Sequence, residues 1–188
     1  MAEAAKKQAV YEDLYTIPEN MTGEIIDGEL IVTPRPARRH AHAASALGAD
    51  ITPSFQFGRG GPGGWIIYYE PELHFGKNVL VPDLAGWRRE RLSMLPDEHR
   101  FTVRPDWVCE ILSPGTARRD RMKKMRIYAQ YEVPYAWLID PMIATLEVFR
   151  IESGKWLLLD VFSENEKVKA EPFHEVEIDL ANLWLEDP

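Results

Sequence analysis

An acidic residue followed by a lysine on one strand, downstream of a Pro-Asp pair, is the usual signature of a metal-dependent site for phosphodiester hydrolysis. The chain has the Pro-Asp pair at Pro82-Asp83 and an acidic strand residue at Glu110. Leu112, however, stands where the lysine would be, and lysines follow only later in the segment DWVCEILSPGTARRDRMKK (106–124). Either this pattern is broken or the lysine comes from a neighbouring element.

The chemistry explains why carboxylates and a lysine are needed together. Hydrolysis of a phosphodiester requires a nucleophile at neutral pH and a place for the developing negative charge. A Mg²⁺ ion held by one or two carboxylates, with most of its waters retained, can provide both. A lysine close to two carboxylates should remain charged, so an electrostatic role is favoured over that of a free base.

The residues around Glu110 are typical of a strand from 106 to 112. Side chains alternate along a strand, so Glu110 shares a face with Val108 and Leu112, while Cys109 points to the other face and is expected in the core. An unpaired buried carboxylate costs several kcal/mol, of order 2–7 for a polar group and more for a charge. Glu110 is therefore expected to have a cation, a proton or water beside it.

A helix is expected from Thr116, as N-cap, to about Gln130. Residues four apart share one helix face, so Asp120, Lys124 and Tyr128 form a line, and the lysine stem can reach a neighbouring strand end. Lys123 points about 100° away. The alternative is that Asp120 and Lys124 form only a surface ion pair worth about 0.3–0.5 kcal/mol.

The remaining elements predict a mixed α/β fold with a central sheet. The apolar run 133–140 after the helix indicates a βαβ unit with parallel pairing. We expect one domain over 1–188, with an arm or short helix in the first 20 residues and a β-rich acidic part at 145–188. The other expected elements are a hairpin of strands 23–26 and 29–33 around Asp27-Gly28, a helix 38–51, a flexible glycine-rich turn at 57–64, paired strands 64–75 and 78–88, a loop 89–104 with a helical turn at 93–99, and strands at 145–151, 155–162 and 175–180.

Charge and composition limit the class of protein. The 188 residues carry a net charge of −8, which argues against an indiscriminate nucleic-acid binder. Residues 86–126 nevertheless hold 11 Lys/Arg against 6 Asp/Glu, so a polyanion would bind there if anywhere, although a solvated charged helix explains the charge equally well. The single cysteine and the lack of an apolar span or leader favour a soluble cytoplasmic protein with no membrane contact.

Three segments, taken in order, resemble a known family. GELIVTPRPARRH, VPDLAGW and WVCEILSPGTARRDRMKKMRIYAQYEVPYAWLIDP are similar to the Uma-type family of bacterial candidate restriction endonucleases, within the PD-(D/E)XK nuclease superfamily, over about residues 20 to 150. The resemblance implies a restriction-endonuclease-like core, a central mixed sheet flanked by helices. It also implies that Asp83 and Glu110 hold Mg²⁺ or Mn²⁺, that Glu24 completes the acidic set, and that the lysine comes from the next helix, as Lys124.

The resemblance implies a metal-dependent DNA endonuclease acting as a homodimer. His40 matches a family histidine at the start of the first helix and, with Asp120, is a possible further site residue, although a lone histidine more often decorates a helix. Glu70 and Glu72 are expected to be solvated, with Glu70 a possible member of the acidic cluster, and Tyr128 and Trp137 to be core residues. Two alternatives stay open: an inactive nuclease fold that binds nucleic acid or protein, and a phosphodiesterase acting on RNA.

Overall fold

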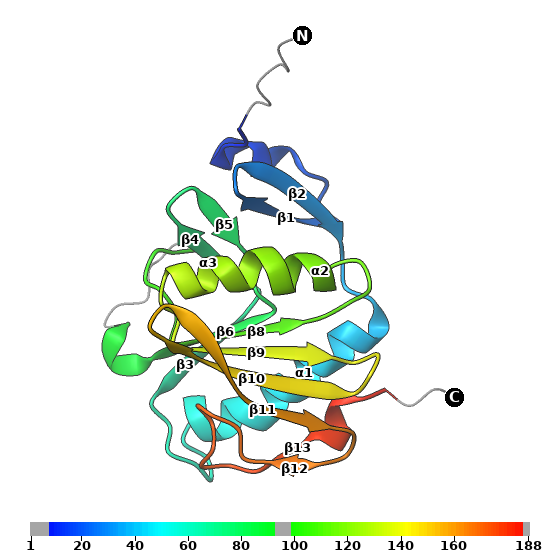
Figure 1. Ribbon diagram of the computed structural model, residues 1–188, viewed down its shortest axis with the longest axis vertical. Helices are drawn as coiled ribbons and strands as arrows, with labels where there is room; N and C mark the ends of the chain where they lie inside the picture. Colours follow the sequence, from blue (N-terminus) through cyan, green and yellow to red (C-terminus); the bar gives the residue numbers. More distant parts are fainter. Residues whose placement is uncertain (1–7, 93–98, 186–188) are drawn as a thin grey trace.

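Two β-sheets meet at the position of the Pro-Asp pair in the computed structural model, which describes residues 8–92 and 99–185 (Figure 1). A six-stranded sheet has the order β11-β10-β9-β8-β6-β3, and a five-stranded sheet has the order β2-β1-β5-β4-β7. The mixed α/β architecture with flanking helices confirms the expected fold class. The elements, with η for 3-10 and π segments, are η1 (Tyr11–Thr16), β1 (Met21–Ile26), β2 (Glu29–Pro34), α1 (Arg38–Ile51), η2 (Thr52–Gln56), β3 (Trp65–Tyr69), β4 (Glu72–Phe75), β5 (Asn78–Leu80), β6 (Leu84–Arg88), η3 (Arg89–Arg91), β7 (Arg100–Phe101), β8 (Trp107–Ile111), α2 (Ala117–Arg119), η4 (Asp120–Lys124), α3 (Met125–Gln130), β9 (Tyr135–Asp140), β10 (Thr145–Glu152), β11 (Lys155–Ser163), β12 (Lys167–Val168), β13 (Ile178–Asp179) and η5 (Leu180–Leu183).

Strand β8 is buried along its whole length and separates two hydrophobic clusters. Trp107, Cys109 and Ile111 pack with α1 on one face, while Val108 and Leu112 pack with α3 on the other. The alternation predicted for this strand is therefore confirmed, and Glu110 points to the side covered by the α2–α3 helix. Strands β8 and β9 pair in parallel, as the βαβ unit predicted.

The crossover helix runs from Ala117 to Gln130 as α2, η4 and α3. Its middle part, η4, is a π segment with a wider turn than an α-helix, which is frequent at functional sites. Thr116 stands at the N-cap position as predicted, but its hydroxyl oxygen accepts a hydrogen bond from the Ser113 backbone N–H at 3.3 Å instead of capping the helix. Asp120 and Lys124 both point inward from η4 and are buried.

Of the two expected strands, 64–75 was wrong as a continuous strand, whereas the second was expected to end at Pro82-Asp83 and does break there; at each break the chain passes from one sheet to the other. The first breaks at Glu70-Pro71, where Glu70 has a left-handed φ of +46°, and the second breaks at 81–83. A proline lacks the N–H that a ladder needs, so Pro71 and Pro82 favour these breaks. The pairing itself holds in both halves, as β3 with β6 and β4 with β5.

The hairpin and the helix predicted in the N-terminal half are both present in the structure. The hairpin β1–β2 turns at Asp27 and Gly28, whose φ values of +53° and +78° suit the predicted two-residue turn. Helix α1 has the predicted bounds. At the other end, the expected strand 175–180 is reduced to β13 followed by η5, and the helical turn expected at 93–99 lies almost wholly outside the described residues.

Helix length also bears on membranes. Among the described residues, no helix is both long enough and apolar enough to cross a bilayer.

Candidate active site

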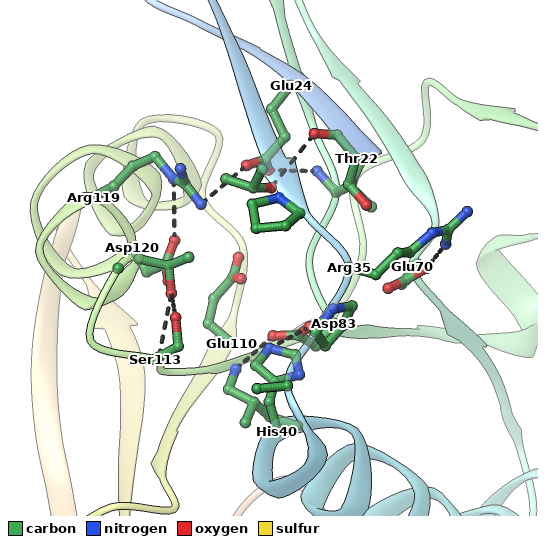
Figure 2. A pocket seen from close by; sticks show the side chains of 18 of the residues that line it. Thr22, Glu24, Arg35, His40, Glu70, Asp83, Glu110, Ser113, Arg119 and Asp120 are labelled. Carbon is green, nitrogen blue, oxygen red and sulfur yellow. Dashed lines mark hydrogen bonds and ion pairs between the residues drawn. The ribbon is translucent and has the colours of Figure 1, made fainter. Parts of the chain in front are cut away.

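A cavity of about 290 Å³ opens where β1, the segment 34–37, the 81–83 break and the start of the crossover helix converge (Figure 2). We call it the acidic cavity. It is lined by six residues that were predicted as members or possible members of the site. They are Glu24, His40, Asp83, Glu110, Asp120 and Lys124.

Lys124 reaches from η4 to two carboxylates and one carbonyl. Its Nζ lies 2.8 Å from Glu110 Oε2, 2.9 Å from Glu24 Oε1 and 3.1 Å from the Val81 carbonyl oxygen. Nζ also lies 2.8 Å from Glu110 Oε1, so four protein oxygens surround an ammonium group that has three donors. Burial by itself would lower the pKa of Lys124, but the charges of Glu110, Glu24 and Asp120 outweigh it and hold the pKa well above its usual value. Lys124 is therefore a fixed positive charge.

Glu110 is fully enclosed at the end of β8. One of its oxygens also accepts a hydrogen bond from the Tyr128 hydroxyl, which lies one turn after Lys124 on the same helix face. Burial raises the pKa of Glu110 well above its usual value; Lys124 opposes the shift, and the nearby carboxylates of Asp120, Asp83 and Glu24 add to it. Tyr128 is buried in the core as predicted, and its hydroxyl also serves the site.

Asp83 is held at the break before β6 from two sides. Its Oδ2 accepts a hydrogen bond from the Ile111 backbone N–H at 2.6 Å, and its Oδ1 lies 3.0 Å from Nε2 of His40. Burial by itself lowers the pKa of His40, but the hydrogen bond to Asp83 and its charge raise it above the usual value. The neighbour in sequence, His42, contacts the Asn182 carbonyl oxygen instead, away from the cavity.

Asp120 and Glu24 complete the acidic wall. Glu24 Oε1 accepts from the Val81 backbone N–H at 2.8 Å. Asp120 is 3% exposed, and burial raises the pKa of its carboxyl. The alternative of a surface Asp120–Lys124 ion pair is therefore wrong, because both groups are buried and Lys124 pairs with Glu110 and Glu24.

Charge balance tests whether these residues fit a divalent metal. Four carboxylates, those of Glu24, Asp83, Glu110 and Asp120, line the cavity with the cations of Lys124 and Arg119, while Arg35 and Glu70 offset each other. Carboxyl groups therefore outnumber the cations of Lys124 and Arg119 in the lining. Among residues 8–92 and 99–185, no group of three or more acidic, histidine or cysteine side chains forms a ready-made metal site. Since Mg²⁺ is usually bound through one or two carboxylates and several waters, the donor set fits such an ion.

Arg119 lines the cavity but was not predicted as a site residue. Its guanidinium lies 3.8 Å from Glu24 Oε2 and 3.6 Å from Asp120 Oδ1, and its buried Nε has no hydrogen-bond partner among the described residues. Figure 2 shows it reaching over the cavity from the crossover helix. The chain is basic throughout 118–126, so nothing in the sequence distinguished Arg119 from its neighbour Arg118.

Two glutamates near the cavity differ in their surroundings. Glu70 lines the mouth and lies 3.7 Å from Arg35, consistent with the expected possibility that it joins the acidic cluster. Glu72 was expected to be solvated, which is wrong: it accepts hydrogen bonds from the Tyr11 hydroxyl at 2.8 Å and from His74 at 2.7 Å.

Comparisons with known proteins identify a family and a similar fold. The family model of Uma2, described as "Putative restriction endonuclease", matches residues 9–181. Among solved structures, the chain is similar to a crystal structure described as a putative nuclease belonging to DUF820 from Anabaena variabilis. That match has a TM-score of 0.70 and 23% identity, and covers 93% of this chain and 97% of that one. None of the curated proteins compared matches the chain.

Proposed function

The chain belongs to the Uma2 family, and we propose that it is a nuclease that hydrolyses DNA phosphodiester bonds in the acidic cavity with the help of Mg²⁺ or Mn²⁺. One observation carries the proposal: Asp83 and Glu110 line one cavity in which the buried ammonium of Lys124 contacts Glu110. Burying a set of charges of this kind costs folding free energy, and such sets cluster at functional sites.

Asp83 and Glu110 are the residues proposed to hold the ion. When bound, Mg²⁺ supplies charge neutralisation and a nucleophile at neutral pH. The chain fixes Asp83 through the Ile111 N–H and His40, and fixes Glu110 through Tyr128 and Lys124. Both carboxylates are thus oriented before any ligand enters, which is the preorganisation that catalysis requires.

Lys124 contributes its charge. All three N–H donors are occupied and its pKa is raised, so it stays protonated and cannot serve as a free base. In this proposal its charge stabilises the negative charge that develops on the phosphate; orienting the attacking water would require it to release one of its present acceptors. Glu24 forms a second ion pair with the ammonium, and the negative charge of Asp120 also raises the pKa of Lys124.

His40 is proposed to position Asp83. Its Nε2 contacts Asp83, while its buried Nδ1 is without a hydrogen-bond partner among the residues described. An unsatisfied buried nitrogen at a cavity wall is a place where a water or a phosphate oxygen can bind. A histidine that orients a metal-binding carboxylate in this way typically changes activity without itself reacting.

The experiment incubates the purified chain with circular DNA, both double-stranded and single-stranded, in Mg²⁺, Mn²⁺ or EDTA. We expect cleavage in either metal, none in EDTA, and a loss of about 100-fold or more in Asp83→Asn and Lys124→Ala, as for other preorganised charge-stabilising groups. Lys123→Ala is the matched control, because Lys123 pairs with Glu29 outside the cavity. Cleavage that survives both site substitutions would refute the proposal.

DNA binding that metal leaves unchanged, with no cleavage, would instead favour a binding module. The expected homodimer stays a prediction, which light scattering on the purified chain tests.

A further inference from the structure

The charged groups of the acidic cavity lie well below the surface. Glu24, Glu110, Asp120 and Lys124 are each 2–3% exposed. The segment 34–37 and residues of the turn at 113–116 line the cavity around them, so a phosphate must leave the surface of the protein to reach these groups. Duplex DNA is stiff, with a persistence length of about 50 nm, and cannot turn a single phosphate inward without a cost. An unpaired strand can make this turn freely.

A second hollow adjoins the acidic cavity. It has a volume of about 630 Å³ and shares Thr22, Arg35, Glu70 and Val81 with the cavity lining. Its remaining wall is rich in aromatic side chains, and we call it the tyrosine groove. The aromatic residues are Tyr11, Tyr15, Tyr68, Tyr69 and Phe101.

The tyrosine groove offers exposed aromatic surface beside arginines. Tyr15 is 65% exposed, and its hydroxyl accepts a hydrogen bond from Arg100 at 3.1 Å. The same guanidinium lies 4.3 Å above the Tyr11 ring. Arg35, at the junction of the two hollows, has a side chain that is 60% exposed. Aromatic faces next to arginine side chains are how proteins bind unpaired bases without sequence preference.

The charges also favour a single strand over a duplex. Glu70 and Glu72 line the tyrosine groove, and the whole chain carries a net charge of −8. A duplex is the denser polyanion and depends more on phosphate neutralisation, whereas a single strand gains much of its binding free energy from stacking. This surface therefore discriminates against the duplex.

We propose that the substrate is unpaired DNA, with one strand running from the tyrosine groove into the acidic cavity. A phosphate lies at Asp83 and Glu110, and a neighbouring base stacks on Tyr15. The substrate class rests on the proposed nuclease function, but the preference for a single strand can be measured without cleavage.

The test uses one oligonucleotide sequence, single-stranded and as a duplex, with the full chain. Binding is measured by fluorescence anisotropy in EDTA, and we expect the single strand to bind about tenfold more tightly, in line with stacking of one base. Tyr15→Ala should remove this preference, while Tyr15→Phe, which keeps the ring, should retain it. Phe57→Ala is the matched control, because Phe57 is 57% exposed beside Arg59 and lies outside both hollows.

Equal or tighter binding of the duplex, or an unchanged preference in Tyr15→Ala, would overturn the inference. Cleavage of the same oligonucleotides and of a small phosphodiester, bis(p-nitrophenyl) phosphate, is measured separately in Mn²⁺. Tyr15→Ala should raise KM for the single strand, whereas Phe57→Ala should leave both KM and hydrolysis of the small diester unchanged. Failure to hydrolyse any substrate would overturn the proposed function, whereas the anisotropy result decides the strand preference independently.

Discussion

Replacing Lys124 with methionine should destabilise the fold far more than the same change at Lys123. Methionine keeps the length of the stem but removes a charge that lies 2.8 Å from Glu110 and 2.9 Å from Glu24. Removing one partner of a buried ion pair typically costs about 3–5 kcal/mol. Because Glu110 can take up a proton and so avoid a bare buried charge, we expect the lower end, about 3 kcal/mol. Lys123 is 3.2 Å from Glu29 with both side chains well exposed, so its loss should cost about 0–1 kcal/mol.

The assay is urea denaturation in EDTA, followed by tryptophan fluorescence. The free energies of unfolding of Lys124→Met and Lys123→Met are compared with that of the unaltered chain. A double variant, Lys124→Met with Glu110→Gln, should recover part of the loss, because a neutral amide needs no counter-ion. If both lysine variants lose the same stability, or if the double variant is less stable than Lys124→Met, the buried charge cluster does not exist as described.

Three further predictions concern the site and its support. Asp83→Asn should abolish measurable Mn²⁺ binding in titration calorimetry, and unchanged affinity would exclude Asp83 as a ligand. His40→Ala should lower metal affinity or cleavage by about 10–100-fold, as expected for a group that orients a ligand. Wild-type values would show that His40 has no role in the site. Gly48→Ala should lower the melting temperature, because its Cβ would lie 1.2 Å from the Tyr69 hydroxyl oxygen and overpacking costs about 1–3 kcal/mol. Adding Tyr69→Ala, which removes the ring whose Cζ would otherwise lie 2.2 Å from the new Cβ, should relieve that clash, and a Gly48→Ala chain that melts normally would contradict it.

Lys124 was predicted from the family resemblance, and helical periodicity agreed with that choice. Leu112 occupies the usual place and is a core residue, while the four-residue spacing of Asp120, Lys124 and Tyr128 places all three on the inward face of the crossover helix. Two of these side chains contact Glu110 directly. The strand alternation and the helix repeat are short-range properties of the chain, so they placed these side chains on facing surfaces, but the resemblance was needed to prefer this arrangement over a surface ion pair.

The strand breaks could be predicted only in part: Pro82 indicated a strand end beside Asp83, but not that the chain changes sheet there. Pro71 and Pro82 were visible in the sequence, but a proline also fits an edge strand, and only the packing of two sheets decides that the chain changes sheet there. Asp83 owes its place in the cavity to one of these breaks. The hairpin, α1 and the β8–β9 unit were predictable because each is specified by its own segment.

Arg119 and the tyrosine groove depend on contacts between distant segments. The groove joins η1, β4 and β7 through Tyr11, Glu72 and Arg100, which are far apart along the chain. Arg119 differs from Arg118 only in direction around the helix, and of the two only Arg119 lines the cavity. Such features follow from tertiary packing and carry no local sequence signal.

The most direct measurement of the central claim is the anomalous scattering of a crystal soaked in Mn²⁺. The account predicts an ion bound by carboxylate oxygens of Asp83 and Glu110 inside the acidic cavity, absent from crystals of Asp83→Asn. An ion bound elsewhere, or a cavity that stays free of Mn²⁺ at saturating concentration, would contradict it.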